Sequence, residues 1–119
     1  MKKDQRFPRE ERLSASKEVR WLIKNGKKYV GSILILYAHT SPGPQSRAGF
    51  IVSKRVGPAV VRNRFKRWMR ESFRRQKSVF GDGMDLIFIA RSRAHVRTGY
   101  AEVFEELTRF ALKITDPAK

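Results

Sequence analysis

The residues best suited to chemistry lie in one strongly basic stretch, from Lys54 to Lys77. An Arg-Asn-Arg triplet at 62–64 is followed closely by further cations, and Glu71 is the only acid in the stretch. The planar fork of an arginine can grip a phosphate with two hydrogen bonds, whereas a lysine ammonium acts as a point charge. The stretch therefore predicts contact with a phosphate-bearing polyanion.

A helix over about 58–78 would divide this stretch into two faces. At about 100° per residue, one arc of roughly 140° is apolar and an opposite arc of roughly 100° is basic. The apolar arc holds Val61, Phe65, Trp68, Met69 and Phe73. The basic arc holds Asn63, Lys66, Arg67, Arg70, Arg74 and Lys77, flanked by Arg62 and Arg64. We expect the first arc to be buried in a core and the second to form an exposed ridge.

The charge of the whole chain also indicates a polyanionic partner. Its 119 residues include 27 Lys and Arg against 11 Asp and Glu, for a formal net charge of +16. Nucleic acid is the commonest polyanion that such a surface meets in a cell. A membrane surface and an acidic protein are the alternatives. The membrane is disfavoured because the aromatic residues of the apolar arc suit a globular core.

Self-contained catalysis has little support in the sequence. The chain has no cysteine, which excludes thiolate nucleophiles, disulfides and cysteine-based zinc sites. Asp82 lies between two glycines as turn residues do, and Asp85 opens a predicted strand, so a two-metal nuclease site is disfavoured. His39 and His95 have no carboxylate at an interpretable spacing. We predict no catalytic residue, no metal site and no cofactor bound by the protein alone.

Hydrophobic periodicity predicts a small α+β domain around the basic helix. A first helix is expected over about 15–25 and a last helix over about 98–114. Strands are expected over 33–38, 48–53 and 85–90, the first two as a hairpin with a long loop. The element order is then α-β-β-α-β-α, with the helices packed on a small mixed sheet.

The length of the chain supports a single core, so we expect one domain over 1–119. Residues 1–12 are charged, contain Pro8 and show no periodicity, which is typical of a flexible basic arm. No segment approaches the ~20 apolar residues of a membrane span, and the N-terminus lacks the apolar region of a signal peptide. We therefore expect a cytoplasmic location and no membrane partner.

The basic stretch resembles the signature of the protein component of bacterial ribonuclease P. The RNR motif of that family matches Arg62-Asn63-Arg64, followed by Lys66-Arg67 and Arg70. The preceding Ser53-Lys54-Arg55, the strand that follows at 85–91 and the order of elements agree as well. The resemblance covers roughly residues 12–115.

The resemblance implies a single two-layer α/β sandwich with an unusual left-handed βαβ crossover, against the right-handed norm. It also implies a noncatalytic protein subunit, monomeric without RNA, of the ribonucleoprotein that cleaves the 5′ leader from precursor tRNA. The catalytic RNA and its Mg²⁺ would carry the chemistry. The expected contacts to that RNA are Lys54, Arg55, Arg62, Asn63, Arg64, Lys66, Arg67, Arg70 and Arg74.

The same resemblance implies a cleft between the first helix and the sheet that holds the single-stranded leader. The matching positions are Val19, Ile23, Ile35, Tyr37, Ile51 and Ser53. Family members often carry two phenylalanines four residues apart where this chain has Val19 and Ile23. Aliphatic side chains fill such a groove but give up base stacking, which is worth about 1–3 kcal/mol per base. Trp21 projects toward the opposite side of the helix and is no obvious substitute.

Two other functions remain open at this point. A ribosomal protein or RNA chaperone that binds structured RNA would share the basic ridge but would need no leader cleft. A protein-only nuclease would need a catalytic site, for which the sequence offers no clear candidate.

Overall fold

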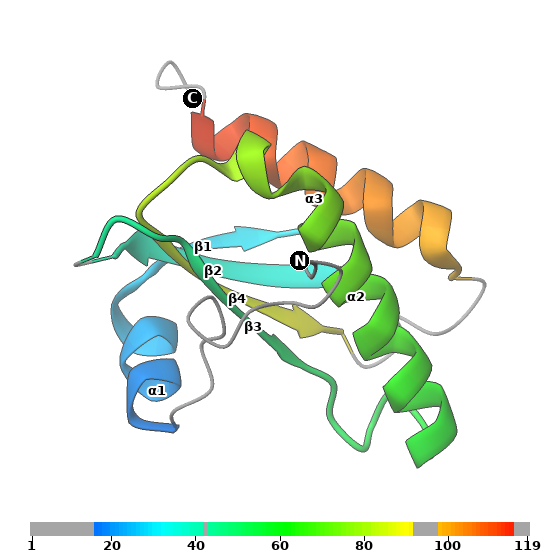
Figure 1. The fold of residues 1–119 in the computed structure, drawn as a ribbon. Helices are drawn as coiled ribbons and strands as arrows, with labels where there is room; N and C mark the ends of the chain where they lie inside the picture. Colours follow the sequence, from blue (N-terminus) through cyan, green and yellow to red (C-terminus); the bar gives the residue numbers. More distant parts are fainter. Residues whose placement is uncertain (1–15, 42, 92–97, 116–119) are drawn as a thin grey trace, which may run out of the picture.

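The computed structural model describes residues 16–41, 43–91 and 98–115, which form three helices and one four-stranded sheet (Figure 1). In chain order the elements are α1 (Ser16–Asn25), β1 (Lys27–Val30), β2 (Leu34–Thr40), β3 (Arg47–Ile51), α2 (Ala59–Phe80), β4 (Met84–Ala90) and α3 (Tyr100–Thr115). The class is α+β with a mixed sheet, as the sequence predicts. The predicted arm, residues 1–12, lies outside the described residues.

The predicted element order lacks one strand, so the observed order is α-β-β-β-α-β-α. The additional strand, β1, pairs antiparallel with β2, with Val30 opposite Ile35. It has only four residues, and its burial pattern is mostly exposed. A short edge strand of this kind carries little hydrophobic periodicity, which is why the sequence pattern does not reveal it.

The predicted hairpin of the second and third segments is wrong. β2 and β3 do not pair with each other, because β4 lies between them in the sheet order β1-β2-β4-β3. β4 pairs antiparallel with β2 and parallel with β3. Its apolar run, with Leu86, Ile87 and Phe88 fully buried, suits a central strand that is covered on both faces. Neighbours in sequence are usually, but not always, neighbours in a sheet.

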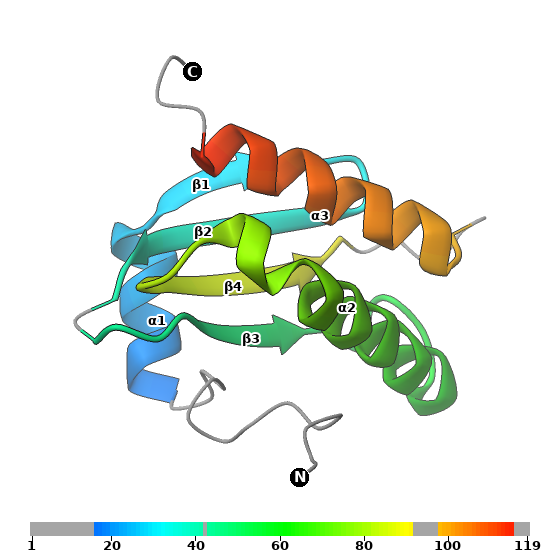
Figure 2. The ribbon, with the colours of Figure 1, turned by 45° about the horizontal axis from the view of Figure 1, so that its top comes forward.

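The parallel pair β3–β4 is joined through α2, which gives a βαβ crossover. When Figure 2 is turned so that both strands point up with α2 in front of the sheet, the chain moves leftward from β3 to β4. This is the left-handed sense that the family resemblance implies, and it opposes the usual right-handed rule.

The main core lies between the sheet and the layer formed by α2 and α3. Every second residue of the two central strands faces it, including Leu34, Leu36, Leu86 and Phe88. Phe65, Met69, Phe73 and Phe80 from α2 and Val103, Leu107 and Phe110 from α3 fill the other side. The predicted apolar arc of α2 is therefore confirmed as the buried face. Trp68 and Val61 lie at its partly buried margins.

α1 lies on the opposite face of the sheet and covers only part of it (Figures 1 and 2). Leu22 is its buried contact, packed on Ile87 of β4. The rest of that face carries half-buried side chains, so the fold leaves one open sheet surface beside α1. No helix in the described part of the chain is long and apolar enough to cross a membrane.

Candidate nucleic-acid interface

The exposed face of α2 forms a shallow hollow of about 350 Å³ whose charged lining residues are all basic. Its lining consists of Val60, Asn63, Arg64, Lys66, Arg67 and Arg70. No carboxylate is among these residues, so nothing in the lining offsets the four cations. Four predicted RNA contacts, Arg64, Lys66, Arg67 and Arg70, thus lie together on one surface with Asn63, and their contact with RNA stays a prediction. We call this surface the RNR ridge.

Arg62, the first arginine of the triplet, is less free than its neighbours. Its Nε donates a hydrogen bond to the carbonyl oxygen of Gly57 at 3.1 Å, and the side chain is half-buried. Pro58, at the helix N-cap, offers no side-chain capping bond. Arg62 therefore helps to fix the start of α2 as well as adding charge beside the ridge.

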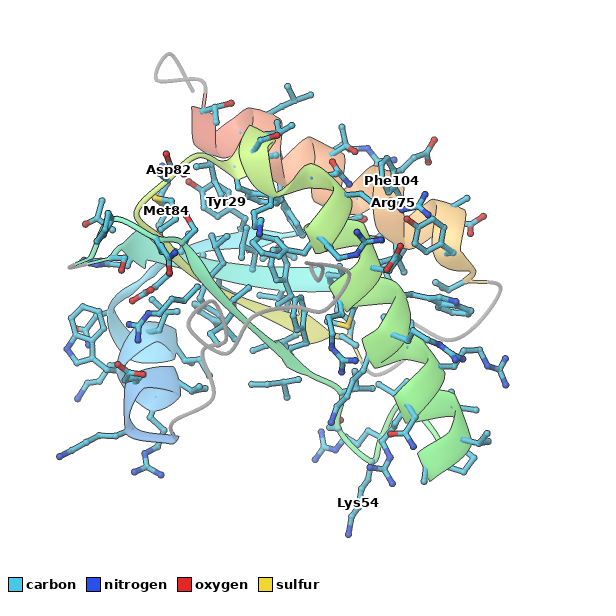
Figure 3. The ribbon with its side chains drawn as sticks, viewed as in Figure 1. Tyr29, Lys54, Arg75, Asp82, Met84 and Phe104 are labelled. Carbon is cyan, nitrogen blue, oxygen red and sulfur yellow. The ribbon has the colours of Figure 1, made fainter. Side chains whose placement is uncertain are left out.

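Lys54 and Arg55 continue the positive charge beyond the start of α2. Both are exposed in the turn after β3, where the Val56 amide donates to the Ser53 carbonyl at 3.1 Å. Figure 3 shows the Lys54 side chain pointing away from the fold near the start of α2. These two residues and the RNR ridge thus lie at the same end of the molecule.

Arg74 and Arg75, further along α2 than the RNR ridge, are engaged within the protein. Arg74 binds the Glu71 carboxylate at 2.5 Å, and Arg75 Nε reaches the same carboxylate at 3.0 Å. The hydrogen bond from Arg74 is the main cause that lowers the pKa of Glu71 from its ordinary value of 4.5. The Arg75 guanidinium also lies 5.8 Å from the Tyr100 ring centroid, on the side of α2 that faces α3 (Figure 3). Arg74 was predicted as an RNA contact, but it does not line the hollow.

The predicted leader cleft corresponds to the open sheet surface beside α1. Val19, Tyr37 and Ile51, three of the six predicted residues, pack around Leu22 and Ile87. Ile89 belongs to the same cluster but was not predicted. Strand alternation could have found it, because Ile87 and Ile89 are two residues apart and so share a face.

The other three predicted cleft residues are placed differently. Ile35 is half-buried and lies in the same row of the sheet as Ile89 and Ile51. Ile23 is 36% exposed on α1 and lies outside the packed cluster. Ser53 is exposed beyond the end of β3. Lys28, which was not predicted, holds its Nζ 6.0 Å from the Tyr37 ring centroid and brings positive charge to this surface.

Comparison with known proteins identifies the family. A family model described as Ribonuclease P matches residues 7–115. The ribonuclease P protein component of Clostridium kluyveri is 38% identical over 94 residues, which cover 77% of this chain and 83% of that protein. The chain belongs to the ribonuclease P protein family.

Solved structures of ribonuclease P proteins share the fold described above. The Thermotoga maritima protein is 31% identical with a TM-score of 0.79, covering 89% of this chain and 99% of that one. The Staphylococcus aureus protein is 29% identical with a TM-score of 0.77, covering 89% of this chain and 95% of that one. The strand order and the crossover are therefore features that this chain shares with ribonuclease P proteins of known structure.

The two carboxylates that could suggest a metal site, Asp82 and Asp85, are placed differently. Arg47 binds the Asp85 carboxylate through two hydrogen bonds, of 2.9 and 2.8 Å. Asp82 is exposed in the turn between Gly81 and Gly83. Within the described residues no three His, Cys, Asp or Glu side chains form a group that could hold a metal ion. His95 lies outside the described residues.

Proposed function

We propose that this chain is the noncatalytic protein subunit of ribonuclease P, the ribonucleoprotein that removes the 5′ leader from precursor tRNA. The observation that carries this proposal is the RNR ridge, whose hollow is lined by four cations and no acid on a chain of the ribonuclease P family. Such a surface gains free energy by replacing the counterions of a polyanion. The catalytic RNA is the polyanion that we assign to it.

The precursor leader is assigned to the surface between α1 and the sheet. A single-stranded nucleic acid is held by flat or apolar side chains that contact its bases and by cations that follow its backbone. Tyr37 supplies an aromatic ring there, Val19 and Ile51 supply apolar walls, and Lys28 supplies a nearby cation. Binding of the leader in this cleft would raise the affinity for precursor over mature tRNA.

Catalysis is assigned to the RNA subunit and its Mg²⁺. Phosphodiester hydrolysis by a protein alone commonly requires clustered carboxylates that hold two metal ions. Of the two candidate carboxylates, Asp85 is held by Arg47 and Asp82 is exposed in a turn, and neither belongs to a metal-binding group among the described residues. The role left for the protein is to bind and position the RNA partners, with no cofactor of its own.

The test is cleavage of a precursor tRNA at low Mg²⁺ by a bacterial ribonuclease P RNA, with and without this protein, beside the protein alone. Stimulation that requires both components is the expected result. Cleavage by the protein alone would place catalysis on the protein. Tight RNA binding without stimulation would favour a ribosomal protein or RNA chaperone.

A further inference from the structure

A second cavity lies on the side of α1 opposite the leader cleft. It measures about 390 Å³ and is lined by Glu18, Trp21, Leu22, His39, Thr40, Ser41, Arg47 and Asp85. Around α1, Val19 and Ile23 lie on one side of Leu22, whereas Glu18 and Trp21 lie on the other. The proposed function makes no use of this cavity.

The strand register separates the two sites in the same way. His39, Asp85 and Arg47 lie opposite one another in one row across β2, β4 and β3. The other rows on this face are apolar. Tyr37 lies opposite Ile87, and in the next row, further from His39, Ile89 lies opposite both Ile35 and Ile51. The sheet face under α1 thus has an apolar end, where the leader cleft is proposed, and a polar end that forms the floor of the second cavity.

Trp21 is the most conspicuous side chain at this cavity. It is 51% exposed, although a tryptophan usually buries most of its large apolar surface. The indole meets the His39 ring edge-on, with centroids 4.9 Å apart and an interplanar angle of 90°. Its backbone carbonyl accepts a hydrogen bond of 2.9 Å from Nδ2 of the Asn25 side chain. The indole thus contacts the protein through His39 while half of its surface stays open to solvent.

The charges on the floor beside Trp21 are largely paired. Arg47 binds Asp85 through two hydrogen bonds and also reaches Glu18 at 3.1 Å. This network ties α1 to β3 and β4. Because Arg47 already serves two carboxylates, it is not available as an anion receptor, and recognition must rest on the aromatic surface.

Two cations, Lys17 and Lys24, lie on the same face of α1 as Trp21, whereas the adjacent Arg20 points about 100° away around the helix. The two lysines stand four residues before and three residues after Trp21, which places them beside it on the helix surface, and both are exposed. A positively charged ligand is disfavoured here because the chain carries a net charge of +16. A flat ligand with flanking negative charge fits both the indole and the lysines.

We propose that this cavity binds an unpaired RNA nucleotide, with its base stacked on Trp21 and its flanking phosphates near Lys17 and Lys24. The inference rests on the proposed function, because that function supplies the RNA. The nucleotide has two possible sources, an upstream part of the precursor leader or an unpaired residue of the catalytic RNA. Stacking on an aromatic side chain is worth about 1–3 kcal/mol per base, which corresponds to roughly 5- to 150-fold in affinity.

The direct test uses the fluorescence of Trp21. The chain has two tryptophans, so Trp68→Phe leaves Trp21 as the only one. Titration with a single-stranded cytidine hexamer should quench the emission to saturation. Trp21→Leu in the natural chain should weaken binding of the hexamer at least 5-fold, whereas Trp21→Phe should retain part of the affinity. If Trp68→Phe perturbs folding, the two Trp21 variants still provide the measurement by filter binding.

The matched control is Leu112→Ala, because Leu112 is a 58% exposed apolar residue on α3. It should leave the affinity for the hexamer unchanged. Unquenched Trp21 emission in a folded protein, or equal affinity of Trp21→Leu and the natural chain, would overturn the proposal.

Assays with the assembled enzyme distinguish the two possible sources of the nucleotide. If Trp21→Leu weakens binding of precursors with long leaders but not of precursors with short ones, the leader occupies the cavity. If the variant instead weakens assembly with the catalytic RNA, that RNA occupies it. Unchanged values in both assays would overturn the proposal. Failure of the natural chain to stimulate the catalytic RNA would reject the proposed function, an outcome distinct from any result with Trp21.

Discussion

The Glu106 carboxylate occupies the space that a side chain at Gly31 would need. Glu106 lies on α3 and is only 2% exposed. Its Oε2 accepts hydrogen bonds from the backbone amides of Ile33 at 2.8 Å and Leu34 at 2.7 Å, and its Oε1 accepts one from Ser32 Oγ at 3.2 Å. A Cβ at Gly31 would overlap this carboxylate. One buried acid thus fastens α3 to the turn between β1 and β2.

Gly31→Ala is therefore expected to destabilise the fold. The added methyl would displace a buried carboxylate from its hydrogen-bond donors, and an unsatisfied buried acceptor costs about 1–3 kcal/mol or more. Thermal unfolding should show a Tm lower by several degrees. Gly43→Ala is the matched control, because a Cβ at Gly43 meets nothing within 4 Å. Equal Tm values for the two variants would show that the carboxylate is not fixed in this position.

Glu71 should contribute stability that depends on pH. Arg74 and Arg75 lower its pKa in the folded state, so the ion pairs stabilise the fold fully above the ordinary value of about 4.5. The contribution is lost as the pH falls through the lower folded-state pKa. The difference in unfolding free energy between the natural chain and Glu71→Gln should therefore be largest near neutral pH and vanish in acid. Denaturant titrations between pH 7 and pH 3 measure it.

Glu105→Gln is the control for that series. The Glu105 side chain is 72% exposed, and its contact with Arg109 is long, at 3.7 Å. An exposed ion pair of this kind contributes little. Its free-energy difference should stay near zero at every pH, and a response matching that of Glu71→Gln would contradict the assignment.

The buried face of α2 can be predicted from the sequence alone. Phe65, Met69 and Phe73 repeat at helical spacing, and their burial requires no knowledge of the rest of the fold. Pairing of strands is different, because it depends on which apolar run occupies the sheet centre. β4 intervenes between β2 and β3 although it follows both in sequence.

The candidate sites divide along the same line. The RNR ridge is local to one helix, so spacing alone places Arg64, Lys66, Arg67 and Arg70 together. The pairing of Glu71 with Arg74 and Arg75 is also local, yet the charge pattern alone did not distinguish engaged arginines from free ones. The cavity at Trp21 unites α1 with the ends of three strands, and only the tertiary fold brings those residues together.

The position of each arginine on α2 predicts a ranking of effects on RNA binding. Arg64→Ala and Arg67→Ala should each weaken binding of the catalytic RNA, because both side chains line the hollow. Arg74→Ala should have a smaller effect, because Arg74 is held by Glu71. If about six phosphates are neutralised, log K should fall with log salt at a slope of roughly −4 to −5, and each lost contact should reduce that slope by about 0.7–0.9.

Lys113→Ala is the control for that ranking. Lys113 is exposed in the last turn of α3, so the variant removes one charge away from the RNR ridge. Its salt slope should match that of the natural chain. If Lys113→Ala weakens RNA binding as much as Arg64→Ala and Arg67→Ala do, binding depends on the net charge of the protein and not on the RNR ridge.

Tyr37 should discriminate precursor from mature tRNA. Its ring lies in the proposed leader cleft with Lys28 nearby. Tyr37→Ala should weaken binding of the leader-bearing precursor by about 1–3 kcal/mol, the range for loss of one stacked base, and should leave mature tRNA unaffected. Tyr37→Phe keeps the ring and should retain most of the affinity. Equal losses for precursor and mature tRNA would remove Tyr37 from the leader site.

Ile23, which lies on α1 outside the packed cluster of the proposed cleft, offers a gain of function. It is an aliphatic residue at a position where the family resemblance implies an aromatic ring, and its 36% exposure leaves room for a larger side chain. Ile23→Phe should tighten binding of the precursor severalfold, because a ring adds stacking that an aliphatic side chain cannot supply. Leu112→Phe, on α3, tests whether any exposed phenylalanine has this effect. Tightening with mature tRNA as well as precursor would show that the new ring does not meet the leader.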